Sequence, residues 1–241
     1  VGSIYDMTLS KQDYVDSRSG LTPAEQLQAI CKAVPALYKQ RDKIVSQLEK
    51  RLRACNICAL KPEELDGKER KQVENWFRDE LQPILSPQVV DSRHPFPHLS
   101  NKVLNIVLRL QSDDQEALGL IPIPQSLPPY FVLRERGVRY ILTEDVLLEY
   151  AKKLFPTFSV QGKAVCSVTR NADIDVKEGM MDHDIDYREI MADLLKRRRK
   201  LAAVRLQVTP TAPQEILRLL CDKLELSHKR VFAQKLSLIH I

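Results

Sequence analysis

The chain contains 241 residues, of which 44% are hydrophobic and 29% are charged, and its formal net charge at pH 7 is +5. This length suffices for one large domain or two smaller ones, and the composition is that of a soluble globular protein rather than a disordered or fibrous one. The apolar runs are shorter than the ~18 residues that a membrane-spanning helix needs. The modest positive charge is compatible with a polyanionic partner but does not by itself indicate nucleic acid.

A long amphipathic helix is predicted over residues 22–55. Thr22 is a favourable N-cap, Pro23 suits the first helical position, and Glu25 completes a capping box. Apolar residues then recur with helical spacing as far as Cys55. We expect Pro35 to kink this helix, because its ring removes a hydrogen-bond donor and crowds the preceding turn.

The next segments are predicted to be a helix, an extended stretch and three strands. Pro62 marks the start of the helix, whose apolar positions include Trp76 and Phe77 and which ends before Pro83. Four prolines between residues 83 and 97 predict that the segment SRHPFPH is extended and lies at the surface. Apolar runs at residues 102–111, 116–123 and 130–135 have the lengths of strands.

The second half of the chain alternates helices and strands. Thr143 is predicted to cap a helix that Pro156 stops, and further elements are a strand at 163–169, a helix at 185–199, a strand at 203–208 and a helix at 211–224. The order has no regular β-α-β rhythm, and hairpin-length gaps join several strands. We therefore predict an α+β fold with a mainly antiparallel sheet.

The cysteines and histidines form no recognisable metal or catalytic site. Five cysteines, an odd number that lies mostly in apolar segments, indicate reduced thiols rather than a disulfide framework. Cys55 and Cys58 form one C-x-x-C without the second pair of ligands that zinc requires, so we interpret them as structural thiols. His94 and His98 are four residues apart, but the two prolines between them prevent the helix that would place both on one face.

The stretch CSVTRNADIDV (166–176) is predicted to be a strand that runs into a polar turn. Asn171 and Asp173 can hydrogen-bond their own backbone, and Arg170 can bridge acidic neighbours, so a structural turn is the favoured reading. Arg170 is also a candidate for contact with a polyanion. The acidic residues that follow do not form a calcium loop, because Lys177 occupies a ligand position and the required glycine comes one place late, at Gly179.

Five consecutive cations, residues 196–200, close the predicted helix at 185–199. One interpretation is a solvated helix end, where cations favour the macrodipole. The alternative is that Arg197, Arg198 and Arg199 hold successive phosphates, a task for which the guanidinium fork is well suited. The helical period places Arg198 on the apolar stripe, where it points inward or extends along the surface.

These segments together resemble the bacterial polyphosphate kinase family that builds long chains from ATP. The resemblance is carried by CSVTRNADIDV, by KRRRKLAAVRLQV (196–208), by SRHPFPHLSNKVLNIVLRL (92–110), by YFVLRERGVRYILTEDV (130–146) and by VGSIYD at the start. It implies that residues 1–60 are the end of a helical N-terminal domain and that residues 61–234 are the head domain.

The resemblance also implies an activity that belongs to the parent enzyme. That enzyme reversibly transfers the terminal phosphate of ATP to a polyphosphate chain through a phosphohistidine, with Mg²⁺, in the cytoplasm, with or without membrane association of the parent complex. The head domain is expected to serve homo-oligomer formation and to frame the path to the active site. None of the five histidines begins an H-x-K pattern, and no G-x-x-x-x-G-K-[ST] loop is present, so we expect the isolated chain to be inactive and to bind no cofactor.

Two further expectations concern the ends of the chain and a rival function. The first residue is Val1, from which we expect the chain to start inside a longer protein, and residues 235–241 read as a non-native tail, the alternative being a natural apolar strand. The rival is a non-catalytic module that binds polyanions or nucleic acid. Aromatic residues are only 6% of the chain and no RRM signature or zinc-finger spacing is present, so specific nucleic-acid binding has little support.

Overall fold

The structure is a computed structural model that describes the chain except for residues 11–12, 92, 113–114, 134–136, 172–201 and 235–241. Within the described residues, the strands form two sheets. The larger sheet has the order β2-β4-β3-β7-β8-β9 and is antiparallel apart from the β8/β9 pair. Its strands are β2 (Gln88–Val90), β3 (Leu104–Gln111), β4 (Glu116–Pro122), β7 (Ser159–Arg170), β8 (Ala203–Val208) and β9 (Val231–Ala233).

The smaller sheet has the order β1-β6-β5, in which β1 pairs with β6 in parallel and β5 pairs with β6 antiparallel. Its strands are β1 (Ile57–Leu60), β5 (Tyr130–Leu133) and β6 (Val138–Leu142). Trp76, at the end of α3 (Gly67–Trp76), stacks on Phe131 of β5 with ring centroids 4.7 Å apart. The small sheet therefore packs against α3 rather than standing alone.

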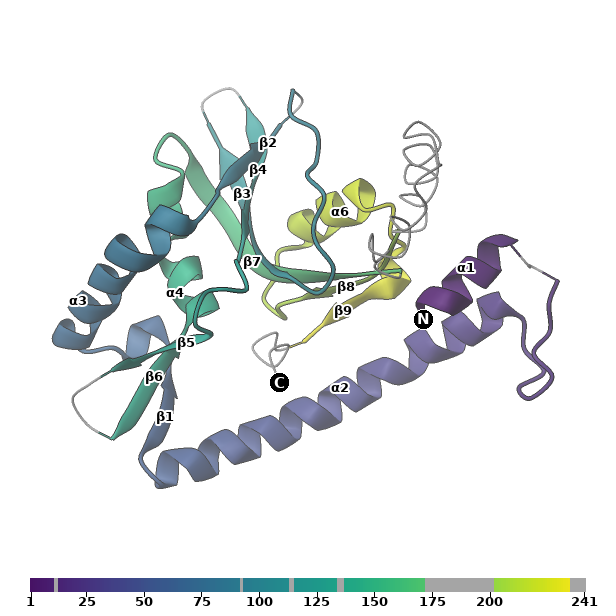
Figure 1. Cartoon of the computed structure of the whole chain (residues 1–241), viewed down its shortest axis with the longest axis horizontal. Helices are drawn as coiled ribbons and strands as arrows, with labels where there is room; N and C mark the ends of the chain where they lie inside the picture. The colour runs from purple at the N-terminus through teal and green to yellow at the C-terminus, as the bar shows by residue number, and fades with distance from the viewer. Residues whose placement is uncertain (11–12, 92, 113–114, 134–136, 172–201, 235–241) are drawn as a thin grey trace, which may run out of the picture.

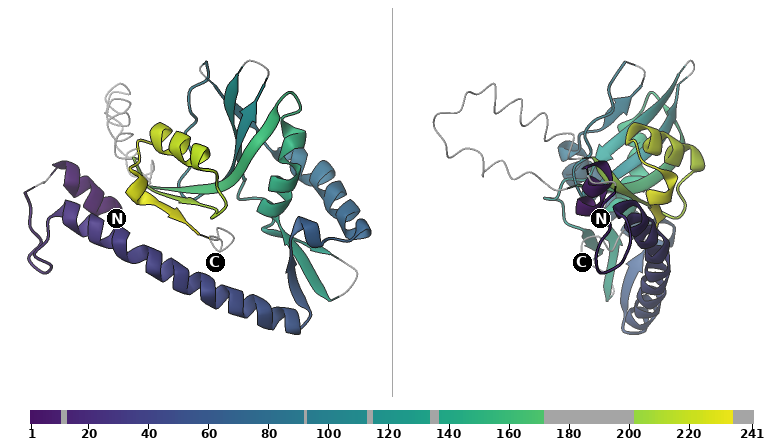
Figure 2. Two further views of the ribbon diagram at one scale, coloured as in Figure 1. Left: turned by 180° about the vertical axis from the view of Figure 1, so that it is seen from behind. Right: turned by 90° about the vertical axis from the view of Figure 1, so that its right-hand side faces the viewer.

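The longest helix is α2 (Pro23–Ala54), which follows the short α1 (Gly2–Ser10) and runs along one side of the molecule (Figures 1 and 2). The predicted capping box is confirmed, since Thr22 Oγ1 accepts a hydrogen bond from the backbone N–H of Glu25 and Glu25 Oε2 accepts one from the N–H of Thr22. The helix continues through Pro35 as one element. Tyr38 joins it to the large sheet by accepting a hydrogen bond from Arg205 of β8 at 2.6 Å.

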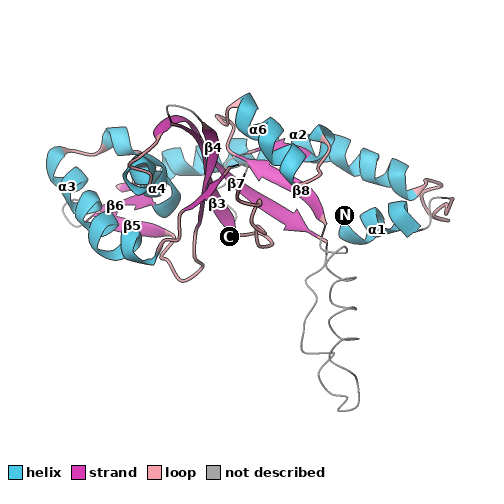
Figure 3. Ribbon diagram, turned by 90° about the horizontal axis from the view of Figure 1, so that it is seen from above, coloured by secondary structure: helices cyan, strands magenta, loops and turns pink. Residues whose placement is uncertain are grey.

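The large sheet is covered on both faces, which explains why β3 is almost continuously buried. Leu104, Ile106, Leu108 and Leu110 belong to a core shared with α3 and with α4 (Thr143–Tyr150), whereas Val107 belongs to the opposite core, beneath α6 (Gln214–Lys223) (Figure 3). Successive residues of a strand point to opposite faces, so alternate β3 side chains enter different cores. The remaining short helices are Pro62–Glu64, Phe77–Leu81, Gln82–Ile84, Ala151–Leu154 and His228–Arg230.

The α+β class with mainly antiparallel sheets is confirmed, and several predicted boundaries are corrected. The helix expected from Pro62 begins at Gly67, because Asp66 and Glu69 form a capping box there and residues 62–64 make only a 3₁₀ turn. Thr143 is not an N-cap: it lies inside α4, and its hydroxyl donates to the carbonyl oxygen of Pro128. The last predicted helix begins at Gln214 rather than at 211.

Other elements match their predictions or were not predicted. The strand at 203–208 has the predicted bounds, and the three apolar runs between 102 and 135 contain β3, β4 and β5. The predicted helix at 185–199 and the tail at 235–241 lie outside the described residues. Strands β1, β2, β6 and β9 and helix α1 were not predicted. Among the described helices, none combines the length and the apolar character that crossing a membrane would require.

Candidate functional site

Arg170, a polyanion candidate from the sequence, is the last residue of β7. Its Nε donates to the carbonyl oxygen of Leu99 at 2.7 Å, and its backbone N–H donates to Asn101 Oδ1 at 2.9 Å. Burial lowers the pKa of its guanidinium group below the usual value. As predicted, the strand gives way to a bend directly after it, at Asn171. The other three candidates, Arg197, Arg198 and Arg199, lie outside the described residues.

A cavity of about 940 Å³ opens beside Arg170. It also contains Lys223 of α6, and the one carboxylate among its described lining residues is Glu225. The rest of that lining is apolar, aromatic or imidazole: Tyr5, Leu9, Phe96, Pro97, His98, Ala202, Ala203 and Leu224. The sequence patterns gave no signal for Lys223, which comes from a distant part of the chain.

A second basic cavity, of about 550 Å³, shares Tyr5 with the first. It lies between α1, the start of α2 and the turn His228–Arg230. Lys32, Lys229 and Arg230 contribute positive charge to it, and its described lining includes hydroxyl groups but no carboxylate. We call Lys32, Arg170, Lys223, Lys229 and Arg230 the basic end of the molecule.

Arg230 is the cation of the basic end that packs on an aromatic ring. Its guanidinium carbon lies 4.7 Å from the centre of the Tyr5 ring, which is a cation–π arrangement. Its Nη1 is buried and has no hydrogen-bond partner in the described part of the chain. A buried donor without a partner is costly, so a ligand oxygen at this position would be stabilised by it. Guanidinium and ammonium groups in such a pocket favour phosphate or carboxylate anions.

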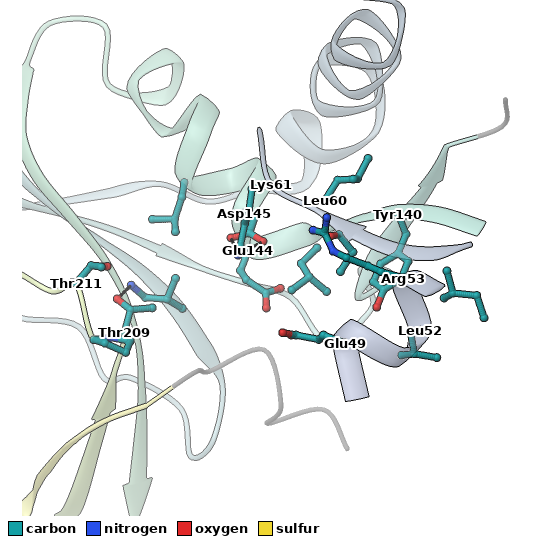
Figure 4. Close-up of a pocket in the computed structure, with 16 residues that line it drawn as sticks. Glu49, Leu52, Arg53, Leu60, Lys61, Tyr140, Glu144, Asp145, Thr209 and Thr211 are labelled. Carbon is teal, nitrogen blue, oxygen red and sulfur yellow. Dashed lines mark hydrogen bonds and ion pairs between the residues drawn. The ribbon is translucent and has the colours of Figure 1, made fainter. Parts of the chain in front are cut away.

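A third cavity, of about 330 Å³, lies at the opposite end of α2 and has a different character (Figure 4). The last turns of α2 provide Glu49 and Arg53, and the start of α4 provides Glu144 and Asp145. The loop after β8, residues 209–211, closes the far side. We call this space the acidic cavity.

Both described cations that line the acidic cavity, Lys61 and Arg53, form ion pairs. Lys61 Nζ lies 2.8 Å from Asp145 Oδ2, and Arg53 Nη2 lies 2.9 Å from Glu64 Oε1. Burial raises the pKa of Asp145, and the charge of Lys61 opposes this shift. Arg53 also donates to the carbonyl oxygen of Ala59 at 3.1 Å, which ties the end of α2 to β1.

Glu144 differs from these paired groups. It is 6% exposed, and its Oε1 is buried with no hydrogen-bond partner in the described residues. Burial is the main cause that raises the pKa of its carboxyl group to about 7. In Figure 4 the carboxyl groups of Glu144 and Glu49 point toward the same space. No sequence pattern distinguished Glu144, because its burial without a partner is a property of the tertiary packing.

The described residues contain no group of three or more histidine, cysteine or acidic side chains placed to hold a metal ion. His94 Nδ1 lies 2.8 Å from Asp91 Oδ1, so this histidine contacts an acidic side chain three residues before it in the chain. Cys55 is exposed at the C-cap of α2, and Cys58 is half-buried on β1.

Comparisons with known proteins agree on one family. The model of a family described as the polyphosphate kinase middle domain matches residues 68–239. The chain is 31% identical to the polyphosphate kinase of Exiguobacterium sibiricum over 239 residues, which cover 97% of this chain and 33% of that protein. It is 31% identical to the polyphosphate kinase of Campylobacter coli over 228 residues, which cover 90% of this chain and 31% of that protein.

The fold is also similar to that of a solved structure. The crystal structure of polyphosphate kinase from Porphyromonas gingivalis matches with a TM-score of 0.74 and 18% sequence identity, over 100% of this chain and 34% of that chain. At this identity the likeness concerns the fold alone. The chain spans about a third of the length of the curated relatives that it matches.

Proposed function

The chain belongs to the polyphosphate kinase family, and we propose that it is a non-catalytic part of an enzyme that transfers the terminal phosphate of ATP to polyphosphate. In the forward direction ATP loses its terminal phosphate and becomes ADP, while the polyphosphate chain gains one unit. The reaction is reversible and passes through a phosphohistidine in the proposed whole enzyme. The family resemblance supports this proposed reaction. From the same resemblance we propose that the protein is cytoplasmic.

We place neither Mg²⁺ nor ATP on the described residues. Magnesium requires several oxygen ligands in octahedral geometry, and the described residues offer no cluster of three or more acidic, histidine or cysteine side chains. No H-x-K pattern and no phosphate-binding loop of the G-x-x-x-x-G-K-[ST] type occurs in the sequence. The proposed role of this chain is therefore to contact polyphosphate and to frame its path.

The basic end is the observation that carries this role. Two cavities that share Tyr5 bring together five cations from distant parts of the chain, and their described lining includes a single carboxylate, Glu225. Such a surface attracts a polyanion, because each contact with a phosphate releases a condensed counterion. We include Arg197, Arg198 and Arg199 in the proposed contact surface on the basis of the sequence alone.

Binding of polyphosphate at graded salt concentrations tests this proposal. Replacing Lys229 and Arg230 together by alanine is expected to weaken binding about tenfold or more and to lower the salt slope by one to two units, roughly one unit for each lost contact. Lys68→Ala with Lys71→Ala is the matched control, because it removes two exposed charges from α3. Equal effects of the two double variants would contradict a specific role for the basic end.

Single-stranded RNA of the same total charge separates the rival function in the same assay. The proposal predicts that polyphosphate binds more tightly than RNA and that the Lys229/Arg230 variant loses this preference. Tighter binding of RNA would favour a nucleic-acid module instead.

The isolated chain is expected to show no polyphosphate synthesis and no ATP hydrolysis. Phosphoryl transfer depends on the positioning and electrostatic stabilisation of the reacting groups, which we assign to another part of the whole enzyme. Incubation with ATP labelled in the terminal phosphate should leave no acid-labile label on the protein. Stable labelling of any of its five histidines would contradict the proposed division of roles.

We further propose, from the family resemblance, that the chain takes part in a homo-oligomer. Analytical ultracentrifugation at several protein concentrations tests this part separately. A mass that stays monomeric at every concentration would contradict it without affecting the proposed contact with polyphosphate.

A further inference from the structure

The acidic cavity contains a buried carboxyl group that the fold does not satisfy. We propose that this cavity binds a small organic cation, an ammonium group on a short alkyl chain, with Glu144 as its main anionic partner. The proposal concerns the opposite end of α2 from the basic end, and it does not depend on contact with polyphosphate.

The first argument is the unsatisfied oxygen. Glu144 is 6% exposed, and its Oε1 has no hydrogen-bond partner in the described residues. Leaving a buried polar atom unpaired costs about 1–3 kcal/mol, and more when the group is charged. Glu69 shows how this fold treats a buried carboxylate that is purely structural: it is 4% exposed and is held by Arg139 through two hydrogen bonds, of 2.7 and 2.9 Å. Glu144 has no comparable partner.

The second argument is the balance of charge. Lys61 and Arg53 are ion-paired with Asp145 and with Glu64, respectively. Among the described lining residues, the carboxyl groups are those of Glu49, Glu144 and Asp145, against the two cations Arg53 and Lys61. The described lining therefore carries one excess negative charge when Glu144 is ionised. A positively charged ligand is therefore favoured over a neutral or negative one.

The third argument is the shape and polarity of the walls, which distinguish an organic cation from a metal ion. Most of the wall is apolar, with side chains suited to methylene groups: Leu52, Ile57, Leu60, Leu142, Leu148, Val165 and Pro210. The volume of about 330 Å³ is at the lower end of the range for small-molecule pockets. Magnesium would require more oxygen ligands or retained waters than such a wall provides.

Several titratable groups face Glu144 and affect its protonation. Glu49 and Arg53 come from α2, Lys61 follows β1, Tyr140 comes from β6, and Asp145 lies in the first turn of α4. Burial is the largest cause of the raised pKa of Glu144. A hydrogen bond from its own backbone N–H lowers this pKa, the charge of Asp145 raises it further and that of Lys61 lowers it. An alkylammonium ion should bind more tightly to the ionised carboxylate, so binding is expected to release a proton and to strengthen as pH rises.

Titration of the whole chain with n-butylammonium, followed by NMR of the Glu144 carboxyl carbon, tests the proposal. We expect saturable shifts and an affinity about tenfold higher near pH 8 than near pH 6, since the carboxyl group ionises between them. The alkylammonium itself keeps its charge in this range. Glu144→Gln should reduce the affinity about tenfold or more, because it removes a hydrogen bond to a charged group.

Glu149→Gln is the matched control on the same helix. Glu149 is partly exposed and lies 3.8 Å from Arg70, outside the lining of the acidic cavity, so this variant should bind n-butylammonium as tightly as the wild-type chain. Titration with n-butanol, which has the same alkyl chain without the positive charge, measures how much the apolar wall alone contributes to binding. Titration with Mg²⁺ tests whether the cavity is instead a metal site. The proposal is overturned by any of four results: no saturable shift, equal affinity in Glu144→Gln, binding of n-butanol as tight as that of n-butylammonium, or tighter binding of Mg²⁺ through Glu144.

Discussion

The two ends of α2 present opposite chemistry. Near its first turn, Lys32 lines a cavity with Lys229 and Arg230 and with no carboxylate among the described lining residues, whereas near its last turn Glu49 lines a cavity with Glu144. Each end holds one buried polar atom that has no partner in the described residues, Arg230 Nη1 at the basic end and Glu144 Oε1 at the acidic cavity. We propose that these two unsatisfied groups, which are of opposite charge, each contact a ligand.

A second buried carboxylate sharpens this comparison. Glu69 and Glu144 are almost equally buried, but Glu69 is paired with Arg139 across α3 and β6. Pairing makes Glu69 a structural element, since it joins two parts of the fold. Glu144 contributes no such link. Its burial without a partner for Oε1 is the observation from which we propose a ligand at this position.

The largest expected effect is the loss of the Glu69 pair. Arg139→Ala leaves a buried carboxylate without its partner, and we expect the free energy of unfolding to fall by about 3 kcal/mol. Arg78→Ala is the control, because its ion pair with Asp79 is exposed on both sides and should contribute less than about 1 kcal/mol. Urea denaturation measures both variants. A loss in Arg139→Ala no greater than that in Arg78→Ala would remove the contrast between the paired and the unpaired carboxylate.

The next effect is the pH dependence that Glu144 imposes. Burial raises the pKa of its carboxyl group from 4.5 to about 7, so between these values the folded state keeps a proton that the unfolded state has lost. Its contribution to stability therefore falls as pH rises through this window and is constant above it. From about pH 5 to about pH 8 the expected decline is about 2 kcal/mol.

Glu144→Gln should remove this decline, because the amide does not titrate. The free energy of unfolding of the variant, relative to the wild-type chain, should therefore increase from pH 5 to pH 8. Denaturation curves at both pH values, with Glu149→Gln as the reference, check this expectation. Parallel pH profiles of Glu144→Gln and the wild-type chain would show that Glu144 does not titrate in this window.

A smaller effect separates the structural role of Arg170 from its charge. Arg170→Lys keeps the positive charge but loses the hydrogen bond from Nε to the Leu99 carbonyl oxygen, and Arg170→Ala loses both. We expect both variants to lose about 1 kcal/mol of stability, whereas only Arg170→Ala should lower the salt slope of polyphosphate binding, by about one unit. If both variants keep the wild-type slope, Arg170 is a strand-end residue without contact to the polyanion.

Local signals in the sequence predicted the elements that depend on neighbouring residues. Thr22 and Glu25 mark the start of α2 because a capping box needs only four consecutive residues. The strand at 203–208 was predicted with its observed bounds, since its apolar residues alternate. The prediction that Thr143 is an N-cap was wrong. A hydroxyl group near a helix start can instead donate a hydrogen bond to a distant carbonyl oxygen, here that of Pro128.

Features that depend on distant contacts could not be predicted. Strand β1 has only four residues, and it exists because Ile57–Leu60 pairs with β6, which begins 81 positions after it in the chain at Val138. Among the candidate residues, Arg170 was singled out from the sequence because it lies within the motif at 166–176, and its contact with a polyanion stays a prediction. Lys223, Arg230 and Glu144 were missed, since a single charged residue gives no local sign that it lines a cavity or lacks a partner.

Hydrogen exchange along α2 tests most directly the central claim that its two ends bind ligands of opposite charge. Polyphosphate is expected to slow exchange at residues 24–32 and at residues 227–230 while leaving residues 49–53 unchanged. n-Butylammonium is expected to slow exchange at residues 49–53 and to leave residues 24–32 unchanged. Because both segments belong to one helix, each serves as the control for the other. Protection of the same end by both ligands, or uniform protection along the helix, would contradict the account.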